Sequence, residues 1–142
     1  MFLDETDRKL VSLLRTNARL PVSSLAATLG VSRGTVQNRI DRLMQEGVIL
    51  GFTVRVKPDV EPGAVRAVMM IEIQGKAADK VLEVLGGYTE IRELHTTNGR
   101  WDVVAEIETD SLEAFDQVLR NIRLVDGIAG TETSILLSSR KY

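Results

Sequence analysis

The chain has 142 residues, of which 44% are hydrophobic and 27% charged, as expected for one ordinary globular domain or two small ones. It contains no cysteine, which excludes disulfides and thiolate metal sites. The first residues show neither a basic start nor an apolar run, so no secretory signal is expected. No apolar stretch approaches the ~20 residues of a membrane span. The composition predicts a cytoplasmic protein with no membrane association.

The net charge of −2 is unevenly distributed along the chain. Residues 1–57 contain nine Lys or Arg and five Asp or Glu, whereas residues 58–142 contain nine and fifteen. A basic first half beside an acidic remainder indicates that only the first half meets a polyanion. Chance segregation of surface charge is the alternative interpretation.

Apolar residues recur at helical spacing through the first half, which predicts three helices. Asp4 is expected to cap the first. Ser23 is the expected cap of a second, over residues 24–29, and Ser32 of a third that continues to about Glu46.

Only Gly30 and Val31 separate the second helix from the cap of the third. A glycine at this position suits the left-handed end of a helix. So tight a turn between short helices forces them to cross steeply, which predicts a helix-turn-helix.

The third helix is predicted to bury Val36, Ile40 and Leu43 and to expose a polar face. Asn and Gln can pair with adenine edges, Arg with guanine or phosphate, and Thr with a thymine methyl group. The predicted DNA-binding residues are Ser32, Arg33, Gly34, Thr35, Gln37, Asn38 and Arg42. Asp41 is left out because a carboxylate repels phosphate. An ordinary solvated helix face is the alternative, and Arg39 could instead pair with an acidic neighbour.

Three segments are expected along the chain. Residues 1–57 form the winged-helix-like DNA-binding domain, which includes a linking strand predicted at residues 49–56. Residues 58–64, with two prolines and a glycine, form a linker. Residues 65–142 form an oligomerisation and effector-binding domain.

The second half alternates between strand and helix patterns. The predicted elements are strands at 65–74, 90–97, 102–108 and 127–138, and helices at 77–85 and from Asp110 or Ser111. This order, βαββαβ, predicts a ferredoxin-like sheet and an α+β protein. Four consecutive apolar residues in the first strand, 68–71, indicate that both sheet faces are buried. A second copy of the chain is the expected cover.

Several of these residues together resemble one known family. They are Leu3, Asp4, Glu5, Thr6, Asp7, Leu10, Arg19, Leu25, Ala26, Leu29, Gly30, Val31, Ser32, Val36, Arg39, Ile40, Arg42, Leu43, Gly47, Val48, Ile49, Gly51 and Phe52, with Thr97, Gly99, Asp102 and Thr133 in the second half. The family is that of the Lrp/AsnC (leucine-responsive/asparagine, feast/famine) transcriptional regulators.

The resemblance implies a homodimer, or an octamer of four dimers, that binds pseudo-palindromic double-stranded DNA. It also implies an amino-acid effector held between dimers, and no other cofactor is expected. The effector-binding residues that it implies are Thr97, Asn98, Gly99, Arg100, Trp101, Asp102 and Thr133.

The loop at 97–102 also has a chemical reading of its own. Gly99 can turn backbone N–H groups toward a carboxylate, Asp102 can accept an ammonium group, and Arg100 can clamp an anion. The alternative is a glycine turn in a β-hairpin that Asp102 merely caps.

Two other function classes are open. A tetrapyrrole (haem-like) decarboxylase on the same fold needs catalytic side chains, but the one histidine, His95, lies on a predicted strand, where a structural role is more common. An architectural DNA-binding protein needs no effector. The sequence favours a sequence-specific transcriptional regulator that is modulated by a small effector and is not an enzyme.

Overall fold

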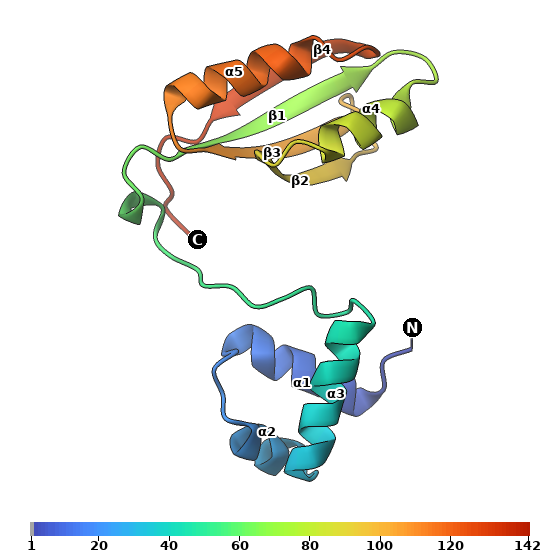
Figure 1. Ribbon diagram of the computed structural model, residues 1–142, viewed down its shortest axis with the longest axis vertical. Coiled ribbons are helices and arrows are strands. Elements are labelled where there is room, and N and C mark those ends of the chain that lie inside the picture. The colour runs from blue at the N-terminus through green and yellow to red at the C-terminus, as the bar shows by residue number, and fades with distance from the viewer. Residues whose placement is uncertain (1) are drawn as a thin grey trace. The chain divides into compact units, whose positions relative to one another are not determined.

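The computed structural model describes residues 2–142 apart from the side chain of Asp59. The chain divides into two compact units, one extending to Arg55 and the other comprising Val56–Tyr142 (Figure 1). Each unit has a hydrophobic core of its own.

The first unit contains α1 (Glu5–Thr16), α2 (Val22–Leu29) and α3 (Arg33–Gln45). Asp4 caps α1 as predicted: its carboxylate accepts a 2.8 Å hydrogen bond from the Asp7 amide. The core consists of one buried stripe from each helix: Leu10, Leu14, Leu25, Ala26, Val36 and Leu43. Burying each large apolar side chain contributes about 1.5–3 kcal/mol, so these stripes hold the three helices together.

The predicted start of α2 is wrong, because Ser23 lies inside the helix and does not cap it. Pro21 occupies the N-cap position with φ −59°. Its carbonyl accepts hydrogen bonds from the amides of Ser24 and Leu25, at 3.0 and 3.1 Å. The fixed φ of proline suits the entry of a helix, so the chain turns into α2 without a side-chain cap.

The linking strand predicted at 49–56 is also wrong for the single chain. Residues 51–57 have no regular secondary structure. Apolar side chains still alternate there, but Leu50, Phe52 and Val54 are exposed by 94%, 52% and 83%. A strand requires a neighbour for its backbone hydrogen bonds, and none joins residues 50–56 within the described chain.

The second unit folds as the predicted βαββαβ sequence. After a short 3-10 turn at Pro58–Val60, its elements are β1 (Val65–Ile73), α4 (Ala78–Gly86), β2 (Ile91–Thr96), β3 (Val103–Thr109), α5 (Leu112–Arg123) and β4 (Ile128–Ile135). The strands form one antiparallel sheet in the order β2-β3-β1-β4. β4 is shorter than predicted, and residues 136–142 leave it as a tail.

The two faces of the sheet differ. Alternate residues of β1 and β3, beginning with Val65 and Val103, pack with α4 and α5 in the core. The other face of β1 carries Val68 and Met70, both half-buried, between exposed charged residues. The predicted second apolar face is therefore a narrow strip with a charged border.

Candidate nucleic-acid interface and effector loop

The turn between α2 and α3 fixes how α3 is presented. Gly30 adopts the left-handed conformation, φ +69° and ψ 33°, that ends α2. The Val31 amide donates to the Ala26 carbonyl at 3.1 Å. Ser32 then caps α3, its Oγ accepting from the Thr35 amide at 3.1 Å. The next helix thus begins within three residues, as a helix-turn-helix requires.

α3 has one buried and one exposed face. Val36 and Leu43 are completely buried, and Ile40 is half-buried. The predicted DNA-binding residues lie away from this core, with Thr35 half-buried and the others exposed: Ser32, Arg33, Gly34, Gln37, Asn38 and Arg42. The helix is therefore amphipathic as expected, and contact of these residues with DNA stays a prediction.

Some of the exposed residues already have side-chain hydrogen bonds within the chain, and others do not. Gln37 donates from Nε2 to Asp41 Oδ1 at 2.8 Å, and the Thr35 and Ser32 hydroxyls are 2.9 Å apart. Neither Arg33 nor Asn38 has a side-chain hydrogen bond to any described residue. Asn38 can therefore offer both its donors and its acceptor to a base edge.

A buried ionic cluster attaches α3 to α1. The Asp7 side chain is only 1% exposed, and its oxygens lie 2.9 Å from Arg39 Nη1 and 2.7 Å from Arg42 Nη2. Arg39 Nη1 also lies 2.7 Å from Asp4 Oδ2. The hydrogen bond from Arg39, followed by that from the Asp7 amide, lowers the pKa of Asp4. Bonds to Asp4 and Asp7 raise the pKa of Arg39.

The sequence left open whether Arg39 pairs with an acidic neighbour. It does, with Asp7 of α1 and with Asp4, the N-cap of that helix. Arg42 was predicted to point outward, and 43% of its side chain is exposed. One of its Nη atoms nevertheless bonds the buried Asp7. A guanidinium carries five N–H donors. Arg42 therefore keeps donors for a phosphate while it holds Asp7.

The structure brings residues 97–102 together in one compact loop. The Thr97 amide donates to the Asp102 carbonyl at 3.0 Å. The Thr97 hydroxyl donates to the Trp101 carbonyl and accepts from the Gly99 amide at 3.2 Å. Asp102 Oδ2 accepts from the Ile73 amide of β1 at 2.7 Å. Asp102 therefore anchors the loop to the sheet, and its other carboxylate oxygen has no hydrogen bond to a described residue.

The remaining predicted effector residues are Arg100 and Trp101 in the loop and Thr133 on β4. The Arg100 guanidinium stacks 4.6 Å from the centre of the Trp101 ring. Thr133 pairs with Met69 of β1, and Met69 lies four residues before Ile73, the residue to which the loop is anchored. Thr133 is therefore not part of the loop. Its buried hydroxyl has no partner among the described residues. The loop and Thr133 are thus separate positions on one sheet.

His95 lies on the open sheet face, 58% exposed, with Nε2 3.1 Å from Glu93 Oε2. Burial, followed by the neighbouring Glu93, raises the pKa of Glu106 on the adjacent strand.

No group of three or more His, Asp or Glu suited to a metal ion occurs within the described part of the chain. No described helix is both long and apolar enough to cross a membrane.

Both units match known domains. Residues 3–44 match the AsnC-type helix-turn-helix domain, and residues 66–142 match the Lrp/AsnC ligand binding domain. The HTH-type transcriptional regulator FL11 of Pyrococcus furiosus is 30% identical over 139 residues, which cover 98% of this chain and 92% of that protein.

Solved structures show the same fold. That of AsnC from E. coli, with 29% identity, superimposes with a TM-score of 0.78 and covers 100% of this chain and 97% of its own. A transcriptional regulator from Neisseria meningitidis, solved as a complex with L-Met, gives a TM-score of 0.76 at 22% identity, covering 99% and 94%. The chain therefore belongs to the Lrp/AsnC family of transcriptional regulators, with a DNA-binding helix-turn-helix unit and a ligand-binding unit.

Proposed function

We propose that this regulator reads DNA through the exposed face of α3 and that a free amino acid modulates its binding. The observation that carries the proposal is the uncommitted polar face of a helix held by the Ser32 cap and the Asp7 cluster. A preorganised helix of this kind can enter a major groove and present amide and guanidinium groups to base edges.

Asn38 is the proposed base reader, and it can be tested directly. Asn38→Ala is expected to relax selectivity by about 1–3 kcal/mol at one base position. Gln45→Ala, at the far end of the same helix, is the matched control. Fluorescence anisotropy with a set of single-base variants of the target would measure both. An equal loss of affinity on every sequence would show that Asn38 is not a base reader.

A second copy of the chain is the proposed partner. The alternating side chains Leu50, Phe52, Val54 and Val56 are exposed in the single chain, as are backbone groups without strand partners. Exposed apolar patches of this kind mark interaction sites. A homodimer, or a larger ring, would present paired α3 helices to half-sites about 34 Å apart or at multiples of that distance.

The proposed effector site is the loop at 97–102. The solved neighbour with L-Met supports an amino acid as the ligand class, and the free Asp102 oxygen suits an ammonium group. Asp102→Asn keeps the acceptor for the Ile73 amide but removes the charge, so it is expected to abolish the response without unfolding the sheet. Asp79→Asn, on the surface of α4, is the control. An unchanged response would place the effector elsewhere.

The first experiment is a titration of the full chain on its own upstream DNA, with and without the twenty amino acids. Specific binding that the amino acids alter supports the sensor. Unaltered specific binding favours an architectural protein without an effector. We propose no catalytic activity, because the exposed His95 side chain has a hydrogen bond only to Glu93 among the described residues and the relatives named above are transcriptional regulators. We also propose that the protein acts in the cytoplasm, where a regulator of this kind would meet its DNA.

A further inference from the structure

Two exposed amide side chains, Gln37 and Asn38, follow one another along α3 and differ in their bonding. The Asn38 amide has no side-chain hydrogen bond to a described residue. Gln37 instead donates from Nε2 to Oδ1 of Asp41, about one helical turn later, at 2.8 Å. The helix therefore presents one amide that is free to rotate and one that is held.

The partner of Gln37 decides which way its amide points. Asp41 is exposed, and the oxygens of a carboxylate accept hydrogen bonds but have no proton to donate. Only the Nε2 end of the Gln37 amide can therefore face Asp41, because Oε1 would bring two acceptors together. Gln37 keeps Oε1 and the second N–H of Nε2 for a partner outside the chain.

The free end of the Gln37 amide is open. No hydrogen bond from another described residue reaches its Oε1. Gly34 lies on the same side of the helix as Gln37 and has no side chain that could cover the amide. The fold does not require this glycine, because the nearest atom to a Cβ at position 34 would be Ser32 Oγ, 4.0 Å away.

The groups that remain on Gln37 suit one purine better than the other. In the major groove, an adenine edge offers one acceptor, N7, and one donor, the N6 amino group. One N–H and one oxygen of an amide therefore pair with it. A guanine edge offers two acceptors, N7 and O6, and would face Oε1 of the held amide. An amide that could turn over would offer its amino group to guanine as well.

Asp41 is otherwise unfavourable at its position. Its negative charge lies on the helix face that would meet the phosphates of DNA, and no ion pair within the described chain offsets that charge. An exposed bond between residues four apart on a helix adds little stability. The orientation of Gln37 is therefore the contribution that the contacts of Asp41 indicate.

We infer that Asp41 is a positioning residue for DNA reading, which holds the Gln37 amide so that Gln37 selects adenine over guanine at one base pair. The inference rests on the proposed function, because it takes α3 to be the helix that enters the major groove. Asp41 was left out of the predicted DNA contacts, and the role inferred here acts through Gln37 without such a contact.

The test is a double-mutant cycle on the full chain. Fluorescence anisotropy would be measured on its own upstream DNA and on single-base variants of the bound site. Gln37→Ala is expected to reduce the preference for adenine over guanine at one position by about fivefold or more, the lower end for a bidentate base contact. Asp41→Asn should reduce it at the same position by about threefold, because an Asn can also donate to Oε1 and lets the amide turn over. In a Gln37→Ala protein, Asp41→Asn should not change the preference further.

Two further variants separate positioning from charge. Glu46→Gln removes the same charge from the exposed C-cap of α3. It should raise affinity for all sequences alike and leave the preference for adenine unchanged. Asp41→Glu keeps an acceptor carboxylate and should retain the preference. Unaltered circular dichroism and urea midpoints would show that each variant is folded.

The outcomes distinguish this inference from the proposed function. The inference is overturned if Asp41→Asn raises affinity equally for every sequence, as Glu46→Gln should. It is also overturned if Asp41→Asn relaxes the preference in the Gln37→Ala protein as much as in the wild type. If Gln37→Ala changes the preference at no base position while Asn38→Ala does, the inference fails and the proposed function stands. A wild-type chain without sequence-specific binding would refute the proposed function, and this inference with it.

Discussion

Replacing Asp7 by Asn should destabilise the first unit far more than any surface change. Its carboxylate is 1% exposed and pairs with both Arg39 and Arg42. Removing one partner of a buried ion pair typically costs 3–5 kcal/mol. The cost should lie near the lower end, about 3 kcal/mol, because Arg39 keeps Asp4 and the partly exposed Arg42 can return to water.

This loss can be assigned to the first unit by using two spectroscopic probes. The single tryptophan, Trp101, lies in the second unit, so its fluorescence reports that unit alone. Far-ultraviolet circular dichroism at about 222 nm reports helix and therefore also follows α1, α2 and α3. With a urea slope of about 1 kcal/mol/M for so small a unit, the first-unit transition should fall by about 3 M. The Trp101 transition should stay in place.

Asp41→Asn is the matched control for this measurement. It makes the same substitution on α3, but Asp41 is exposed, and Gln37 is its only hydrogen-bond donor among the described residues. A surface change of this kind usually stays within about 0.5 kcal/mol. The reasoning fails if Asp7→Asn costs no more than Asp41→Asn. It also fails if the Trp101 transition moves as far as the dichroism.

Three further predictions concern the second unit and DNA. Burial in the folded state raises the pKa of Glu106 above its ordinary value. The contribution of this group to stability therefore falls as the pH rises from the ordinary pKa through the raised one. Glu106→Gln should therefore raise the urea midpoint of Trp101 fluorescence at pH 7, and a gain that persists unchanged at low pH would contradict this. Gly127→Ala should cost about 2 kcal/mol or more by the same assay, since φ is +98° and the new Cβ would lie 2.7 Å from that of Ala77. Gly86→Ala, with open space around it, is its control, and equal costs would refute the steric argument. DNA affinity should fall steeply and linearly with salt on logarithmic axes, and a flat dependence in anisotropy titrations would contradict phosphate binding.

The sequence predicted best where a local signal is strong. Ser32 and Gly30 carry the chemistry of a cap and of a left-handed helix end, and the structure places both as expected. The strands of the second unit also alternate clearly enough to give their order. The start of α2 was predicted wrongly because Pro21, and not Ser23, occupies the N-cap position, so the helix begins two residues earlier than a Ser23 cap would place it.

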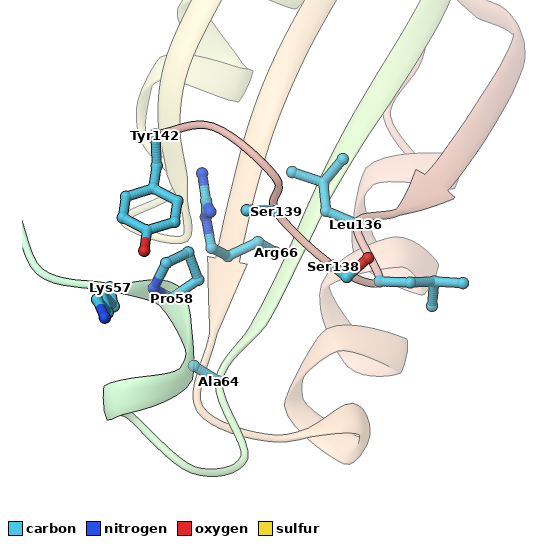
Figure 2. A pocket seen from close by; sticks show the side chains of 9 residues that line it. Lys57, Pro58, Ala64, Arg66, Leu136, Ser138, Ser139 and Tyr142 are labelled. Atoms are coloured by element: carbon cyan, nitrogen blue, oxygen red, sulfur yellow. The ribbon is translucent and has the colours of Figure 1, made fainter.

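The features that the sequence did not reveal depend on contacts between distant segments. No local pattern shows that residues 50–56 lack a strand partner in the single chain. The tail after β4 lies beside the start of β1, where the Leu136 amide donates to the Arg66 carbonyl, although these segments are far apart in sequence (Figure 2). The Asp7 cluster did leave a trace: acids at positions 4 and 7 and arginines at positions 39 and 42 have helical spacing, so each pair lies on one face.

The ion pairs also bear on the uneven charge of the chain, for which chance segregation was an alternative. In the first unit, Arg39 and Arg42 are bound by Asp4 and Asp7, and Lys9 by Glu5. These three acidic side chains therefore form ion pairs within α1 or between the start of α1 and α3. Arg33, which begins the proposed reading helix, has no ion pair among the described residues. Because internal pairing consumes most of the negative charge, the excess positive charge is left on side chains that can meet phosphate. Such an arrangement favours a polyanion partner over chance. Arg39 belongs to the ion pairs of the fold, and contact of Arg33 with DNA stays a prediction.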